Sequence, residues 1–200
     1  NDNGKFVDVS EAAGIYGSLI GFGLGVTVGD VNGDLFPDIY ISNDFYERDY
    51  LYINNKNGTF SEKIQDWTMH LSQSSMGADM ADVNNDGKAD IFVTDMLPEP
   101  DDRLKTTTNF ENYDLFTRKL NLDFYTQFMQ NTLQLNNGNQ QFSEMANYAG
   151  VAKTDWSWGA LLFDMDNDGL KDIYVCNGIY HDLTNQDFMD FFAKKKKKKM

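Results

Sequence analysis

The sequence is poor in the residues that support enzyme chemistry and covalent cross-linking. Among its 200 residues there is one cysteine, Cys176, so no disulfide can form within the chain. The two histidines are His70 and His181, and the sequence contains no HExxH, GxSxG or phosphate-loop motif. We therefore expect no catalytic site and predict that the protein is not an enzyme.

Long apolar runs and basic stripes are also absent. No stretch is apolar over the roughly 20 residues that a membrane-spanning helix needs, so no transmembrane segment is predicted. There are 17 Lys and Arg against 31 Asp and Glu, which gives a formal net charge of -14. Because no basic stripe carries interleaved aromatic residues, we expect no binding to nucleic acid.

What the sequence has in excess is acidic turns, and three of them share one pattern. The turns span residues 30–38, 82–90 and 164–172 and together hold ten carboxylates. Each places oxygen-bearing side chains at its positions 1, 3, 5 and 9 and a backbone carbonyl at position 7, which suits a calcium loop. The predicted metal ligands are Asp30, Asn32, Asp34, Phe36 and Asp38; Asp82, Asn84, Asp86, Lys88 and Asp90; and Asp164, Asp166, Asp168, Leu170 and Asp172.

The alternative is that these are solvated surface turns, because Asp, Asn and Gly are common in turns without a metal. Three turns in one register, each with carboxylates that repel one another without a counter-ion, favour calcium instead. We therefore expect up to three Ca²⁺ sites. Gly87 and Gly169 at position 6 permit the sharp bend, whereas the first turn departs from the pattern with Leu35.

Short runs of β-branched and aromatic residues flank each acidic turn and predict strands. Strands follow the turns at residues 39–41, 91–93 and 173–175, where a helix-loop-helix calcium site would continue into a helix. A glycine stands five residues ahead of each turn, at Gly25, Gly77 and Gly159, and the segments between, such as 160–163, read as strands. Further strands are predicted at residues 50–55, 60–62, 132–137 and 142–144, and at the start of the chain at 4–8.

These acidic turns, the glycines ahead of them and the Asn-Gly-x-Phe hairpins resemble the FG-GAP, or VCBS, repeats. Such repeats occur in integrin α-subunit propellers and in secreted bacterial proteins related to cartilage acidic protein. The resemblance covers most of residues 1–178 and implies an all-β fold, with β-propeller blades of four antiparallel strands and calcium loops. Propellers have 4 to 8 blades, so we expect residues 1–183 to be a partial propeller, part of a larger one. Its other blades are expected from sequence outside the chain or from a partner.

Two segments depart from the repeat. Residues 97–130 form a long insertion in which Phe110, Tyr113, Phe116 and Leu120, at spacings of three and four, predict an amphipathic helix. Its aromatic residues either pack the insertion onto the propeller or form a recognition surface. Residues 184–200 are predicted to form a helix from about Asn185 and a lysine run at 194–199. We treat the run as an artefact of the recorded sequence, the alternative being a basic end that contacts a membrane.

The favoured function is an extracellular calcium-binding module, secreted or at the cell surface, that acts as a scaffold for a protein or glycan partner. Its location follows from calcium, since extracellular modules bind it at about 10⁻⁴ to 10⁻³ M, which suits the free calcium outside cells. One alternative is a propeller-based calcium-dependent enzyme such as a polysaccharide lyase or a phospholipase. Another is a purely structural spacer between other domains.

Overall fold

The computed structural model describes residues 4–109, 111–180 and 184–197 and is built mainly from antiparallel sheets. Three of these sheets are called units below. The first unit contains β1 (Gly23–Gly29), β2 (Asp38–Asn43), β3 (Tyr50–Asn54) and β4 (Phe60–Glu62). The second contains β6 (Gly77–Ala81), β7 (Asp90–Thr94), β9 (Thr132–Asn136) and β10 (Phe142–Glu144). The third pairs β11 (Ser157–Phe163) with β12 (Asp172–Asn177).

The strands predicted around the acidic turns are confirmed, and each unit places its strands side by side in chain order. The strand predicted for residues 4–8 is wrong. The described part of this segment has only an isolated bridge at Lys5, and the Phe6 side chain is 93% exposed. A lone strand is unstable in water without neighbouring strands or a packed face.

Five helices within the described residues make the fold mostly β rather than all-β. Two one-turn helices, α1 (Ile64–Trp67) and α4 (Ala146–Ala149), follow the last strands of the first and second units. The insertion contains α2 (Asp101–Thr107), α3 (Tyr113–Asn121) and β8 (Gln127–Phe128), which pairs in parallel with β5 (Leu71–Ser72). The C-terminal helix is α5 (Gln186–Lys197).

Both predicted helices are confirmed, with differences at their ends. Helix α3 contains three of the four residues of the predicted apolar pattern, whereas Phe110 lies outside the described residues. Helix α5 begins one residue after the predicted start, and the Asn185 side chain accepts a hydrogen bond of 3.0 Å from the Phe188 amide. Helix α2 was not predicted; it begins directly after Pro100.

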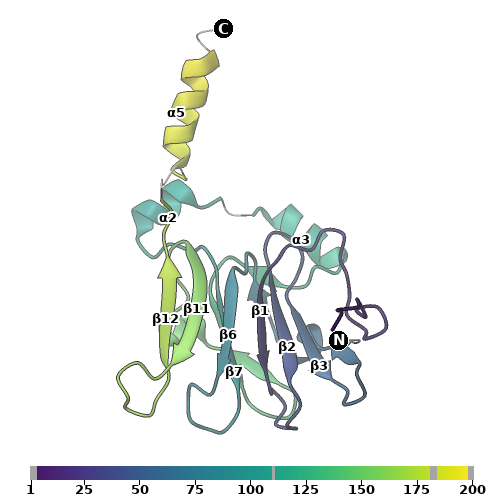
Figure 1. The fold of residues 1–200 in the computed structure, drawn as a ribbon. Helices are drawn as coiled ribbons and strands as arrows, with labels where there is room; N and C mark the ends of the chain where they lie inside the picture. Colours follow the sequence, from purple (N-terminus) through teal and green to yellow (C-terminus); the bar gives the residue numbers. More distant parts are fainter. Residues whose placement is uncertain (1–3, 110, 181–183, 198–200) are drawn as a thin grey trace.

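The three units stand next to one another, with their first strands β1, β6 and β11 adjacent (Figure 1). Two of the three glycines ahead of the acidic turns, Gly25 and Gly77, make this close approach possible. A Cβ atom on Gly25 would lie 3.3 Å from Cα of Gly77. A Cβ atom on Gly77 would lie 3.3 Å from Cα of Gly159 and 2.8 Å from the carbonyl oxygen of Trp158. We call Gly25, Gly77 and Gly159 the glycine column.

The hydrophobic core lies between neighbouring units. Tyr40 and Leu51 of the first unit pack with Ile91 and Val93 of the second. Because successive side chains of a strand point to opposite faces, Phe92 faces the other way and packs with Leu133, Ala160 and Leu162 at the junction with the third unit. Each sheet is therefore stabilised by burying apolar side chains against its neighbours.

A buried carboxylate also joins the first two units. Asp49 accepts hydrogen bonds from the Tyr40 hydroxyl (2.6 Å), the Asn43 amide (2.8 Å) and the Ser75 hydroxyl of the second unit (2.7 Å). Burial raises the pKa of Asp49 to about 7; the nearby Asp95 carboxylate acts in the same direction, and the three hydrogen bonds oppose it.

The second unit has an amide at the place that corresponds to Asp49. Asn131 accepts a hydrogen bond of 2.7 Å from the Asp95 amide and donates one of 2.8 Å to the Val151 carbonyl. The hydrogen-bonding role is therefore shared between the repeats, although this position holds a carboxyl group in the first unit and an amide in the second.

The glycine column predicts that Gly77→Ala destabilises the protein by about 1 to 3 kcal/mol, because the added methyl group meets backbone atoms that cannot move aside cheaply. Gly159→Ala is the matched control, since a Cβ atom there meets nothing within 4 Å. Urea unfolding of both variants measures the difference. Equal free energies of unfolding for the two variants would contradict the close approach of β6 and β11.

The environment of Asp49 predicts a pH-dependent effect of Asp49→Asn. The pKa of Asp49 is higher in the folded protein, so its contribution to stability is present at about pH 4 and is lost as the pH rises towards 7. The asparagine does not titrate. The free energy of unfolding of the variant relative to the native protein should therefore rise between pH 5 and 8, by at most about 3 kcal/mol. Urea titrations at both pH values, in excess calcium, test this, and a constant difference would contradict it.

Candidate metal centres

The three acidic turns lie along one edge of the structure, opposite the helices α2 and α3 of the insertion (Figure 1). Each turn connects the first strand of a unit to the second, as β1 to β2, β6 to β7 and β11 to β12. The adjacent first strands bring the turns to the same edge because all three strands run in the same direction (Figure 1).

The first aspartate of each turn organises the backbone that follows it. Its two carboxylate oxygens accept hydrogen bonds from the amides at positions 5 and 6 of the turn. The pairs are Asp30 with Asp34 (3.1 Å) and Leu35 (2.8 Å), Asp82 with Asp86 (3.1 Å) and Gly87 (2.7 Å), and Asp164 with Asp168 (3.0 Å) and Gly169 (2.8 Å). The three turns therefore share one conformation.

The aspartates at positions 5 and 9 close the same turn. The position-5 side chains accept hydrogen bonds from the backbone amide at position 7. Asp34 accepts from the Phe36 amide at 2.9 Å, Asp86 from the Lys88 amide at 3.0 Å and Asp168 from the Leu170 amide at 2.8 Å. The position-9 side chains accept from the amide at position 2: Val31 to Asp38 at 3.0 Å, Val83 to Asp90 at 2.9 Å and Met165 to Asp172 at 2.8 Å.

The position-9 aspartates of the two complete units have a second role that the sequence analysis missed. Asp38 accepts a hydrogen bond of 2.8 Å from the Asn54 amide at the end of β3, and Asp90 accepts one of 2.8 Å from the Asn136 amide at the end of β9. Burial raises the pKa of both carboxyl groups. The asparagines that end both strands are the sequence signal that could have revealed this link.

The departure at Leu35 changes the strain of the first turn and leaves its hydrogen bonds in place. Positions 4 and 6 have positive φ in all three turns, and position 6 has φ of 85° at Gly87 and 90° at Gly169. Leu35 adopts φ of 69°. Asn85 and Asn167 at position 4 of the other turns also have positive φ, but asparagine tolerates this left-handed region. Leucine there costs about 1 to 2 kcal/mol, so the first turn is the most strained of the three.

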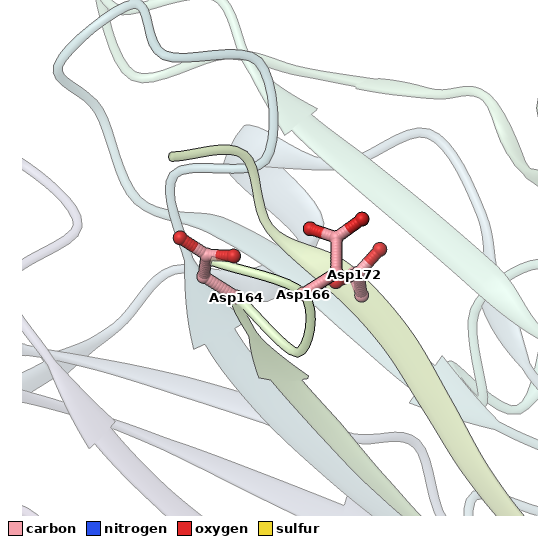
Figure 2. Close-up of side chains that lie close together, drawn as sticks. All are labelled: Asp164, Asp166 and Asp172. Carbon is pink, nitrogen blue, oxygen red and sulfur yellow. The ribbon is translucent and has the colours of Figure 1, made fainter. Parts of the chain in front are cut away.

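The donor atoms of the turns fit a hard divalent cation. In the third turn, carboxylate oxygens of Asp164, Asp166 and Asp172 lie within 4.8 Å of one another (Figure 2). Asp168 is not part of this group. Oxygen ligands on a flexible loop suit Ca²⁺, whereas Zn²⁺ usually takes His and Cys ligands. The first two turns have Asn32 and Asn84 at position 3, which offer a neutral oxygen instead of a third clustered carboxylate.

Two lysines lie against the first and second turns. Lys56 Nζ is 3.2 Å from Asp34 Oδ2, and Lys88 Nζ is 2.8 Å from Asp86 Oδ2. The hydrogen bond from Lys88 lowers the pKa of Asp86. No comparable ion pair reaches the third turn in the part of the chain that the structure describes. An ammonium group competes with a metal ion for the same oxygen, so the third turn offers the most negative of the three sites.

The FG-GAP-like repeat family model matches residues 30–93 and 115–175, which together make up more than half of the chain. The protein therefore belongs to the FG-GAP-like repeat family. The first match contains two of the acidic turns and the second contains the third, and repeats of this family commonly bind Ca²⁺. No curated protein matches the sequence. Among the described residues, no helix has the length and apolar character needed to cross a bilayer.

The third turn predicts a calcium-dependent effect of Asp168→Ala. At about 1 mM calcium and a Kd of about 10⁻⁴ M, loss of one site lowers the free energy of unfolding by about 1.4 kcal/mol. In EGTA the variant should lose less stability than in calcium, because the lost hydrogen bond from the Leu170 amide is partly offset by the removal of one repelling charge. Thermal unfolding with and without calcium measures both values.

Asp190→Ala, which removes an exposed acid from α5, is the control for net charge. It should have no calcium-dependent effect. An equal loss of stability in calcium and in EGTA for Asp168→Ala would mean that the third turn is not a metal site.

Proposed function

We propose that the chain is part of an extracellular calcium-binding β-propeller that acts as a non-enzymatic scaffold for a protein or glycan partner. The observation that carries this proposal is the alignment of three acidic turns, with one conformation, along one edge of adjacent sheets. The family of the chain, whose members are usually extracellular, supports the location.

Calcium gives the scaffold its rigidity under this proposal. The proposed ligands at positions 1, 3, 5 and 9 already stand in turns held by backbone hydrogen bonds, so little reordering accompanies binding. Bound Ca²⁺ would neutralise carboxylates that otherwise repel one another. Each turn also connects the two strands nearest the glycine column, so its order is coupled to the packing between units.

The uncovered faces of the outer units support a propeller with further blades. Tyr174 of the third unit corresponds to Tyr40 and Phe92, which are buried against the next unit, yet Tyr174 is 48% exposed. Leu161 and Phe163 on the same face are also exposed. This face has the apolar character of one half of a junction between units, and an additional blade of the same type would cover it.

The opposite end of the row is uncovered in the same way. Val26 and Val28 of β1 are 68% and 60% exposed. They correspond in register to Ala78 and Met80 of β6, which pack against the first unit. The two ends therefore offer complementary halves of the junction that recurs inside the chain, as a row of blades within a propeller would.

Calcium titration of the purified chain, followed by thermal unfolding and calorimetry, tests the proposal together with activity assays. We expect calcium to raise the unfolding temperature and to bind at up to three sites, with no turnover of pectate, alginate, hyaluronan or phosphatidylcholine vesicles. Calcium-dependent release of unsaturated sugars or fatty acids would instead assign the alternative, a polysaccharide lyase or a phospholipase. The absence of any calcium binding would refute the proposal.

A further inference from the structure

The insertion encloses a cavity on the edge opposite the acidic turns. The cavity has a volume of about 550 Å³, and its wall includes Leu97, Tyr113, Phe116 and Phe128. The rings of Phe116 and Phe128 are stacked, with centroids 5.9 Å apart and an angle of 16° between their planes. This volume and the largely apolar, aromatic wall are typical of sites for small organic ligands.

A second cavity of about 400 Å³ lies beside the first and is lined by Phe45, Tyr46 and Leu115. The two cavities share Gln73, Glu111 and Asn112 in their walls. They therefore form two adjacent compartments, each with aromatic side chains and both in contact with the same polar residues.

The shared polar residues carry almost no net charge. Glu111 Oε1 accepts a hydrogen bond of 2.8 Å from Lys119 Nζ and one of 3.2 Å from Gln73 Nε2. Lys119 is 3% exposed, and its ammonium group lies 5.8 Å from the centroid of the Tyr46 ring. The carboxylate is thus neutralised by a buried lysine, and the compartments favour neither a cation nor an anion.

A buried amide in the wall of the first cavity connects the insertion to the segment that lines the second. Gln127 is 2% exposed, and its Nε2 donates hydrogen bonds to the carbonyls of Tyr46 (3.2 Å) and Phe124 (2.7 Å). Its Oε1 has no hydrogen-bond partner within the described residues, which leaves a buried acceptor in the wall of the first cavity. The pairing of β8 with β5 fixes the position of Gln127 relative to the second unit.

Several aromatic side chains of the walls remain open to solvent. Tyr113 is 79% exposed, Phe45 57%, Tyr46 51% and Phe128 44%. Phe45 also adopts a positive φ of 67°, a strained conformation for an aromatic residue. Packing of the insertion onto the sheets would by itself bury such side chains. Their exposure around two concave compartments leaves ring faces available to a ligand.

We propose that these two compartments bind a neutral oligosaccharide, with successive sugar rings in the first and second cavities. A sugar ring has an apolar face that stacks on aromatic side chains, and hydroxyl groups that both donate and accept hydrogen bonds. The amide groups of Gln73, Asn112 and Gln130 also do both, and all three line the first cavity. This proposal rests on the proposed function and identifies the partner as a glycan.

The other ligand classes fit the compartments less well. A charged peptide or an acidic polysaccharide would need an unpaired protein charge of the opposite sign in the compartments. The ion pair of Glu111 with Lys119 leaves no such charge on these two residues. A lipid chain would cover the amide groups of Gln73 and Asn112 with hydrocarbon, although each uses one atom in a hydrogen bond within the protein, Gln73 Nε2 to Glu111 and Asn112 Oδ1 from Leu115. A neutral chain of two or more rings satisfies both the polar and the aromatic parts of the walls.

The test uses ligand-observed NMR of the full chain in calcium with five disaccharides: cellobiose, maltose, lactose, mannobiose and diacetylchitobiose. Calorimetry then gives the Kd for those that bind. Tyr113→Ala and Phe45→Ala each remove one exposed ring, from the first and the second cavity respectively. Each should weaken binding by up to about tenfold. Tyr148→Ala removes a tyrosine that is 88% exposed on α4 and should leave the Kd unchanged.

Binding of a disaccharide that falls in both cavity variants and not in the control would support the site. No signal from any of the five disaccharides would overturn it, as would binding that is indifferent to either cavity variant. Binding of N-acetyl-phenylalanine amide, without binding of any of the five disaccharides, would identify a peptide site and also overturn it. Calcium-dependent unfolding temperatures from the same samples keep the two proposals apart, because calcium binding without sugar binding refutes only this site.

Discussion

Hydrogen bonds from backbone amides to aspartate side chains are the interaction on which the three units depend. They give Asp30, Asp82 and Asp164 the same surroundings, although the residues between them differ. They also make the acidic edge ordered before any cation arrives, which explains how carboxylates at such density fit a stable fold. Calcium would then add a counter-charge to a conformation that the chain already holds.

The two edges of the sheets have different physical characters. The acidic edge is short, regular and repeated three times, because each turn must reverse the chain between adjacent strands. The opposite edge carries the insertion, which occurs once and breaks the repeat. A rigid row of sheets with an irregular segment at one edge is a common arrangement for recognition, since the scaffold fixes the loops that make contact. The buried pair of Lys119 and Glu111 fixes the insertion in turn.

The sequence predicted the regular part of this structure well. Short runs of β-branched and aromatic residues beside the acidic turns and hairpins predicted ten of the strands in the described residues, because such side chains fit the pleated surface of a packed sheet. The family and the clustered oxygens of the third turn agree with the sequence analysis, whereas ligand roles for all fifteen predicted residues stay a prediction. The prediction of a strand at residues 4–8 was wrong, because a strand there needs a neighbouring strand that the described structure does not contain. Contacts such as Lys56 with Asp34 join separate segments, and no local pattern indicates them.

The glycine column has a further consequence for insertions and deletions. In every unit the acidic turn begins five positions after the column glycine, and side chains on a strand alternate between faces. Removing one residue between Gly77 and Asp82 would turn the apolar side of β6 towards the wrong neighbour and place a bulkier residue at the crossing point. A duplicated or transplanted unit must therefore keep this spacing, whereas the connections at the opposite edge can vary in length.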